Sequence, residues 1–180
     1  MEKLFSNISF IGGIHGVGKS TICNSLCTTL NIRYLSASEV LKWIEINDDA
    51  KNKKVEDIPL TQDRLITGLI KRVEKNHHYL LDGHYCLLDK NSKIVKVPFE
   101  TFEAINPVSL YLIIGLVSEI KSRLESRDKK IYDYQLLDDM QNSEIDYAKE
   151  LSKKIGINLS IGNEKNYSDI LISLKESITN

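Results

Sequence analysis

The feature that most constrains this chain is a glycine-rich run near its N-terminus that ends in a lysine and a serine. Residues 13–20 read G-I-H-G-V-G-K-S, with glycines at the first, fourth and sixth positions. The run matches the pattern G-x-x-x-x-G-K-[ST], in which backbone N–H groups point at the oxygens of a polyphosphate. Side chains would block that close approach, which explains the glycines. The run therefore predicts a phosphate-binding loop.

The segments on either side of this loop support the same interpretation. Residues 8–11 read I-S-F-I and predict a buried strand, and Thr21–Leu30 predicts a helix with apolar residues at four-residue spacing. A helix that starts where the loop ends directs its partial positive charge at the bound anion. Lys19 then supplies a cation for the β- and γ-phosphates, and the Ser20 hydroxyl is placed to coordinate Mg²⁺.

Strand and helix patterns alternate along the rest of the chain. Further strands are predicted at Asn31–Leu35, Tyr79–Asp82, Val108–Ile114 and Ile157–Ile161. Further helices are predicted at Glu39–Asn47 (capped by Ser38), Thr61–Asn76 (capped by Thr61), Pro98–Ile105, from about Ser118, at Asp133–Lys154 and at Ser168–Ser177. Cys86–Leu88 and Ile94–Val97 predict a hairpin, and the polar residues 47–59 predict a solvated loop.

This alternation predicts an α/β fold with three layers, in which a five-stranded parallel sheet lies between helices. Ligands should bind at the carboxyl edge of such a sheet. The chain has 180 residues, so we expect a single domain over 1–180. Its formal net charge of −1 disfavours a nucleic-acid or membrane partner. No apolar run has the length of a membrane span and no secretory pattern opens the chain, so we expect a cytoplasmic protein.

Cysteines and histidines raise the question of a metal site. Cys23 and Cys27 lie four apart on the helix after the loop, without a second Cys pair elsewhere, and small buried side chains on a packed helix explain them better than a metal site does. A second set is close in sequence: His77, His78, His84 and Cys86. Adjacent histidines point to opposite faces of an extended chain, which disfavours a shared metal. Both alternatives stay open at the level of sequence.

Three charged residues further along suit chemistry at a phosphate. Asp82 ends an apolar strand, where an acid can hold Mg²⁺ directly or through water; the alternative is a turn-capping aspartate. Arg123 and Arg127 lie four apart, so their guanidiniums can share one helix face and clamp a phosphoryl group. Spacing alone does not distinguish that clamp from a solvated basic face. His15, inside the loop, is expected to approach phosphate or to pack the loop.

With these residues in view, the chain resembles the adenylate-kinase-like group of P-loop nucleotide kinases over nearly its whole length. Gly13–Thr21 is similar to the GxxGxGKST loop of that group. Leu81–His84 resembles its D-G-F-P-R segment and is nearest the D-x-H form of the archaeal and small nuclear members. The remaining similarities are Ser38–Lys42 to G-D-L-L-R, Pro107 and the following apolar strand, Glu119–Arg127 to R-x-x-x-R, Glu144–Ala148 to E-x-x-x-x-A, and Ser160–Asn163 to the turn that lines the adenine.

The resemblance implies transfer of the γ-phosphate of Mg·ATP to a nucleoside monophosphate or a similar small acceptor. It implies catalytic roles for Lys19, Asp82, Arg123 and Arg127, with Mg²⁺ placed by Ser20 and Asp82 through water. It implies that ATP is contacted by Gly13, His15, Gly16, Val17, Gly18, Lys19, Ser20, Thr21, Arg123 and Asn163. The acceptor would be contacted by Ser38, Lys42, Arg64 and His84, in an acceptor-side region at about 36–76. A short lid at about 127–132 would exclude water.

The acceptor side departs from the pattern of the group at two positions. Lys42 and Cys86 stand where arginines are expected, so Arg64 or Arg72 would have to supply a cation there. Lid arginines after Arg127 are missing as well. Two alternatives therefore remain. One is an adenylate-kinase-like ATPase that acts as a switch or assembly factor with a protein or RNA partner. The other is a kinase for a nucleic-acid end, which the near-neutral charge disfavours.

Overall fold

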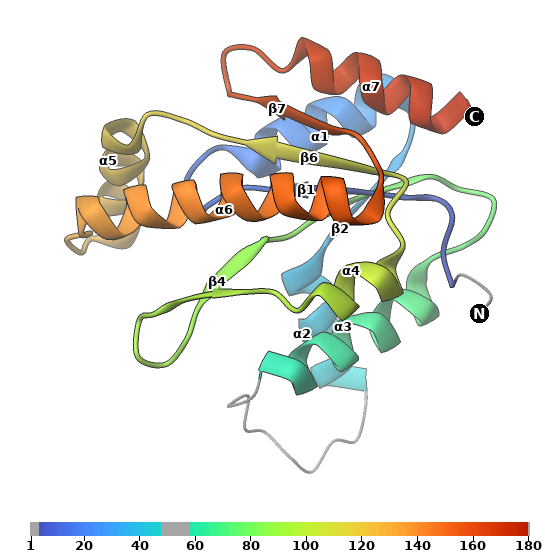
Figure 1. Cartoon of the computed structure of the whole chain (residues 1–180), viewed down its shortest axis with the longest axis horizontal. Helices are drawn as coiled ribbons and strands as arrows, with labels where there is room; N and C mark the ends of the chain where they lie inside the picture. Colours follow the sequence, from blue (N-terminus) through green and yellow to red (C-terminus); the bar gives the residue numbers. More distant parts are fainter. Residues whose placement is uncertain (1–3, 48–57, 180) are drawn as a thin grey trace.

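The computed structural model describes residues 4–47 and 58–179, and side chains within 4–44 and 61–179 (Figure 1). The expected surface loop at 47–59 thus lies almost wholly outside the described residues. The strands are β1 (Ile8–Gly12), β2 (Arg33–Ser36), β3 (Tyr79–Asp82), β4 (Cys86–Leu88), β5 (Ile94–Lys96), β6 (Ser109–Ile113) and β7 (Leu159–Gly162). The helices are α1 (Lys19–Leu30), α2 (Ala37–Asn47), α3 (Ile58–Arg72), α4 (Phe99–Ile105), α5 (Val117–Asp128), α6 (Tyr134–Ile155) and α7 (Ser168–Thr179).

The sheet confirms the predicted fold class. Five strands are hydrogen-bonded in the order β2-β3-β1-β6-β7, and every neighbouring pair is parallel. Parallel neighbours require crossover connections, and the helices that make them cover both faces of the sheet. α1 and α7 lie on one face, while α3, α4 and α6 lie on the other (Figure 1). β4 and β5 pair separately as the expected antiparallel hairpin.

Two apolar cores, one on each face, hold these layers together. Along β3, Tyr79 and Leu81 belong to the core under α3, α4 and α6, whereas Leu80 belongs to the core under α1 and α7. Successive side chains of a strand point to opposite faces, so a strand covered on both faces must be apolar throughout. All five residues of β1 are buried, and its one polar side chain, Ser9, is hydrogen-bonded to His78 and Ser109.

The register of the strands determines which residues meet at the carboxyl edge. Ile11 of β1 pairs with Asp82 of β3, and Gly12 pairs with Leu112 of β6. The glycine loop that follows β1 therefore begins beside Asp82 and beside the segment that follows β6. This edge is where a doubly covered parallel sheet places its ligands.

Two predicted helix starts were wrong. β2 passes directly into α2 at Ala37, so Ser38 lies inside the first turn of the helix instead of capping it. The Ser38 hydroxyl lies 2.9 Å from that of Ser36. α3 begins at Ile58, three residues before Thr61, with Pro59 in its first turn. Proline is tolerated there because the N–H groups of the first turn have no acceptor within the helix.

The packing of α2 on α3 depends on a glycine. A Cβ atom on Gly68 of α3 would lie 2.5 Å from Cγ1 of Val40 and 2.9 Å from Cδ1 of Ile44, both on α2. We expect Gly68→Ala to lower the free energy of unfolding by about 1–2 kcal/mol, because the steric conflict exceeds the gain in helix propensity. Urea denaturation followed by circular dichroism measures this change.

The matched control is Gly115→Ala. The nearest atom to a Cβ at Gly115 is Cδ1 of Ile120 at 3.4 Å, an ordinary contact distance. This variant should stay within about 0.5 kcal/mol of the parent. A Gly68→Ala protein as stable as the parent would show that α2 and α3 are not closely packed.

Candidate active site

The glycine loop has a backbone that only glycine adopts readily. Gly13, Gly16 and Gly18 have φ angles of 142°, 78° and 95°. A Cβ atom at Gly13 would lie 2.5 Å from the carbonyl oxygen of Ile113, and one at Gly16 would lie 2.8 Å from Cγ of Leu124. The glycines thus permit both the turn and its close packing on β6 and α5, since no side chain projects from these three positions.

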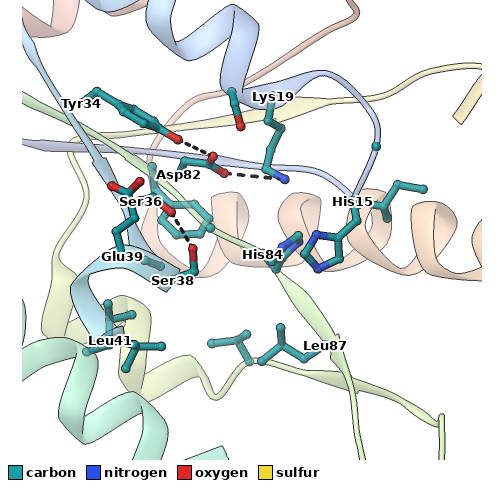
Figure 2. Close-up of a pocket in the computed structure, with 18 of the residues that line it drawn as sticks. His15, Lys19, Tyr34, Ser36, Ser38, Glu39, Leu41, Asp82, His84 and Leu87 are labelled. Atoms are coloured by element: carbon teal, nitrogen blue, oxygen red, sulfur yellow. Dashed lines mark hydrogen bonds and ion pairs between the residues drawn. The ribbon is translucent and has the colours of Figure 1, made fainter. Parts of the chain in front are cut away.

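Lys19 and Asp82 form the charged floor of the site (Figure 2). Lys19 is the first residue of α1 and only 8% exposed, and its Nζ donates to the carbonyl oxygen of Gly13 at 2.8 Å. The same Nζ lies 3.6 Å from Oδ1 of Asp82. Oδ2 of Asp82 accepts a hydrogen bond of 2.9 Å from the Tyr34 hydroxyl. Lys19 and Tyr34 therefore orient the two oxygens of one carboxylate.

Tyr34 is a site residue that the sequence reasoning missed. It lies on β2, which pairs with β3, and its ring comes from the strand beside Asp82. Burial raises the pKa of the Tyr34 phenol, and the negative charge of Asp82 raises it further, so the hydroxyl stays a donor at neutral pH. Finding Tyr34 requires the order of the strands in the sheet, which the periodicity of the sequence does not reveal.

A cavity of about 910 Å³ opens at the carboxyl edge beside these residues. It brings together eleven of the predicted site residues: His15, Gly16, Gly18, Lys19, Ser20, Thr21, Ser38, Asp82, His84, Arg123 and Arg127. Its wall also includes residues of β2, α2, α3, α4 and the β4–β5 hairpin. This volume lies within the range of small-molecule and cofactor sites.

Other predicted residues lie elsewhere. Val17 is 2% exposed and packs in the core under α1. Asn163 lines a neighbouring cavity of about 390 Å³, which shares Arg123 with the larger one. Lys42 and Arg64 line neither cavity. Their contact with an acceptor stays a prediction.

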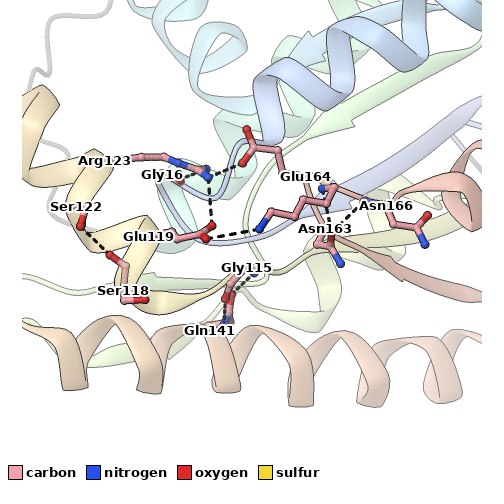
Figure 3. A network of polar contacts seen from close by, with 11 residues as sticks. Gly16, Gly115, Ser118, Glu119, Ser122, Arg123, Gln141, Asn163, Glu164 and Asn166 are labelled. Carbon is pink, nitrogen blue, oxygen red and sulfur yellow. Dashed lines mark hydrogen bonds and ion pairs between the residues drawn. The ribbon is translucent and has the colours of Figure 1, made fainter.

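The two arginines of α5 have different surroundings. Arg123 donates to the carbonyl oxygen of Gly16 at 3.3 Å and pairs with Glu164, and Glu119 lies 3.7 Å away (Figure 3). It is thus held against the back of the glycine loop. Arg127 is 61% exposed and pairs with Asp128 through Nε at 2.6 Å and Nη2 at 2.9 Å. Because Arg127 borders the cavity and pairs only at the surface, its guanidinium can turn toward a ligand at little cost.

His15 and His84 meet across the cavity. Their ring centroids lie 4.4 Å apart, which brings the glycine loop against the turn that follows β3 (Figure 2). Desolvation by the cavity walls lowers the pKa of His15 to about 4, and the charges of His84 and Lys19 act in the same direction. His15 is therefore a neutral side chain at pH 7 in the ligand-free protein, suited to packing or to hydrogen bonding.

A buried carboxylate from α6 supports the turn that carries His84. Glu144 has no exposed surface, and its Oε1 accepts backbone N–H groups of Tyr85 at 2.9 Å and Cys86 at 3.0 Å. Nδ1 of His84 lies 3.7 Å from the same oxygen. The sequence resemblance included Glu144 without giving it a role. The available signal was its position, as an acid, within the otherwise apolar stripe of α6 that contains Met140 and Tyr147.

The thiols and histidines do not form a metal centre in the described part of the chain. Within it, no three His, Cys, Asp or Glu side chains are grouped closely enough to hold a metal ion. Cys86 is fully buried, and burial together with Glu144 raises the pKa of its thiol to about 12. Burial also raises the pKa of Cys27 to about 11. Both thiols are neutral at pH 7 and behave as small core residues.

The described helices were also tested as membrane spans. None of them combines the length and the apolar composition that crossing a bilayer requires.

Comparisons with known proteins bear on the same region. The model of a family described as "AAA domain" matches residues 12–141. Adenylate kinase 1 of Schistosoma mansoni is 30% identical over 100 residues, which are 51% of this chain and 51% of that protein. The chain therefore spans about half the length of this curated relative.

Two solved structures were also compared. An uncharacterized protein from Eubacterium ventriosum ATCC 27560 superposes with a TM-score of 0.51 at 14% identity, over 96% of this chain and 99% of that one. A gluconokinase from Sinorhizobium meliloti 1021 gives a TM-score of 0.49 at 10% identity, over 99% and 94% of the two chains. The likeness to the Eubacterium protein supports the fold alone.

The role of the buried carboxylate can be tested by removing it. Glu144→Ala leaves two buried N–H groups without a partner and opens a cavity beside the turn. We expect the free energy of unfolding to fall by about 3–5 kcal/mol. Glu144→Gln keeps an acceptor oxygen and should lose less, about 1–2 kcal/mol. Guanidinium denaturation of both variants measures the difference, and an alanine variant within about 1 kcal/mol of the parent would contradict the supporting role.

Proposed function

Since the chain belongs to the AAA domain family, whose model spans the glycine loop and the carboxyl edge of the sheet, we propose that it transfers the γ-phosphoryl group of ATP to a small acceptor. The observation that carries this proposal is the single cavity that contains the glycine loop, Asp82 and two arginines. In the finer form implied by the resemblance, the enzyme is nearest the D-x-H type of adenylate-kinase-like protein and the acceptor is a nucleoside monophosphate or a similar small molecule. The 30% identity to an adenylate kinase over half of the chain supports the proposal.

The triphosphate of ATP binds in the glycine loop. Backbone N–H groups of the loop and the N-terminus of α1 provide the anion site. The ammonium group of Lys19 gives up its ion pair with Asp82 and binds the phosphate oxygens instead. Thr21 and His15 line the same wall. Arg123, held against the loop, and Asn163 in the adjoining cavity bind the adenine or a phosphate.

The ion expected with ATP is Mg²⁺, and the side chains near Lys19 suit it. The Ser20 hydroxyl and the Asp82 carboxylate offer hard oxygen donors on one cavity wall, the kind of ligand that Mg²⁺ prefers. Bound there, Mg²⁺ supplies charge neutralisation at the phosphates. The fixed orientation of Asp82 by Tyr34 supports this assignment.

The phosphoryl group moves toward the acceptor end of the cavity. Arg127 turns from its surface pair with Asp128 to the transferring group and neutralises the developing charge. Residues 127–132, which comprise the end of α5 and most of its connection to α6, serve as a short lid, and the region 36–76 forms the acceptor side of a single domain over 1–180. Ser38 and His84 face the acceptor from the cavity wall. Closure by the 47–59 segment lies outside the described residues.

An ATPase switch is the competing function, and one assay separates it from a kinase. ADP release from Mg·ATP is measured without acceptor and with each candidate small molecule. A kinase shows acceptor-dependent release and a phosphorylated product. A switch shows slow release that no small molecule stimulates, and the search then turns to a protein or RNA partner.

Lys19 should be required for ATP binding but not for folding. Removing the ammonium group with Lys19→Met retains most of the buried aliphatic chain. We expect ATP affinity to fall at least about 100-fold, since several charge-assisted contacts to phosphate are lost together. Isothermal titration calorimetry measures the affinity, and circular dichroism checks the fold. Unchanged ATP binding by a folded Lys19→Met protein would exclude the phosphate-loop assignment.

Arg127 should affect turnover more than binding. In Arg127→Ala we expect kcat to fall by about 10²–10³-fold while the ATP dissociation constant changes less than about threefold, because the side chain acts on charge that develops during transfer. Lys175→Ala, which removes an exposed cation of α7 outside the cavity lining, serves as the control and should keep parental kcat. A loss of affinity alone would reassign Arg127 to ground-state binding.

A further inference from the structure

The charges of the large cavity are divided unevenly between its two ends. The end formed around the glycine loop contains three cations, Lys19, Arg123 and Arg127, and two carboxylates, Asp82 and Glu164, so cations are in excess there. The opposite end, here called the acceptor end, is formed by the β2–α2 junction, α2, α3, α4 and the β4–β5 hairpin. Among the wall residues of the acceptor end that the structure describes, the one charged side chain is Glu39, a carboxylate.

The rest of the acceptor end combines neutral polar groups with an apolar surface. Ser36, Ser38, Thr61 and Thr101 supply hydroxyls, and Gln62, which is 8% exposed, supplies an amide that can both donate and accept. Leu41 from α2 and Leu87 from β4 lie on this wall, below Ser38 in Figure 2. The apolar part further includes Leu65, Val97, Phe102 and Ile105.

The acceptor-side residues that the resemblance implied add no positive charge to the acceptor end. Lys42 and Arg64 lie outside the cavity lining, and the position that resembles an arginine site is Cys86, which is fully buried and neutral. Among the described wall residues of the acceptor end, a phosphate dianion would therefore face Glu39 and neutral dipoles. Taking a doubly charged group from water into such surroundings is unfavourable without a paired cation.

From this division we infer that the acceptor is an uncharged hydroxyl compound, of the nucleoside or free-sugar class, and not a nucleoside monophosphate. The inference rests on the proposed kinase function and names the substrate class of the same cavity. Hydroxyls of the acceptor donate to Glu39 and to the serine and threonine oxygens, and its less polar part packs on Leu41, Leu87 and Phe102.

Glu39 has a second use with such an acceptor. The acceptor hydroxyl oxygen forms a new bond to the γ-phosphorus, and the bond from that phosphorus to the β–γ bridging oxygen breaks, with its electron pair leaving on ADP. An alcohol must also lose its proton, which a phosphate oxygen acceptor does not carry. That proton passes to the Glu39 carboxylate and then to water, to which this exposed residue is open. A carboxylate that repels a phosphate acceptor thus assists an alcohol acceptor.

The test compares matched pairs of acceptors. Purified full-length protein is given Mg·ATP with each nucleoside, with the corresponding 5′-monophosphate, and with free pentoses and hexoses. ADP formation gives kcat/KM, mass spectrometry identifies the phosphorylated product, and calorimetry measures ATP binding separately. We expect a nucleoside or a sugar to exceed the best monophosphate by about tenfold or more in kcat/KM, and the two arms show which of the two classes is used.

Two variants of Glu39 sharpen the comparison. Glu39→Gln should lower kcat/KM for the uncharged acceptor by about 100-fold, since it removes the base and the charged hydrogen-bond acceptor, while ATP affinity stays unchanged. Glu39→Arg should lower it as well and should raise kcat/KM for a monophosphate. The control is Glu103→Gln on α4, where the exposed glutamate lies outside the cavity lining; it should behave as the parent.

Each outcome distinguishes the inference from the function on which it rests. A monophosphate preferred about tenfold over its nucleoside would overturn the inference and leave the kinase function standing. Parental activity of Glu39→Gln on an uncharged acceptor would overturn the role of Glu39. ATP binding with hydrolysis that no acceptor stimulates would overturn both the inference and the kinase function.

Discussion

The parallel pairing of β1 with β3 and β6 is the constraint on which the site depends. The register that sets Ile11 against Asp82 also starts the glycine loop beside that carboxylate. The Gly13 carbonyl can then accept from Lys19, whose ammonium group reaches Asp82 across the edge of the sheet. A register shift along β3 would move Asp82 away from the loop or turn it to the other face, since side chains alternate along a strand.

The buried carboxylate of Glu144 extends this order beyond the sheet. α6 packs over β6 and β7, while the turn after β3 belongs to a different part of the chain. Glu144 connects the two by accepting N–H groups at Tyr85 and Cys86. A buried polar group is costly unless it is hydrogen-bonded, so the two N–H groups of the turn and Oε1 of Glu144 satisfy each other. Through the same turn, α6 determines where His84 meets the glycine loop.

The sequence predicted what local patterns encode. The loop motif, the alternation of strands and helices, and the hairpin at Cys86–Leu88 all follow from spacing, and the fold was confirmed. The predicted starts of α2 and α3 were wrong. Ser38 and Thr61 are good capping residues, but each lies in a turn where the helix has already begun. A capping residue shows where a helix can begin, and packing decides where it does begin.

Side chains that act across strands were harder to predict. The contact of Tyr34 with Asp82 requires that β2 lies beside β3, and the contact of Glu144 with Tyr85 requires that α6 covers the turn after β3. Neither requirement is visible in the periodicity of one segment. The residue types were informative all the same, because an acid within an apolar helical stripe must find donors somewhere in the fold.

The charge pattern of the cavity explains how a ligand-free site of this kind stays stable. Lys19 is almost fully buried, and its pairing with Asp82 keeps both charges satisfied before any nucleotide arrives. A triphosphate offers Lys19 a stronger partner, and the exchange frees Asp82 to face a cation that accompanies the phosphates. At the acceptor end, Glu39 has no such buried partner to exchange and instead lies open to water. On the proposed function, the donor end exchanges one set of charges for another, and the acceptor that we infer is a molecule that brings none.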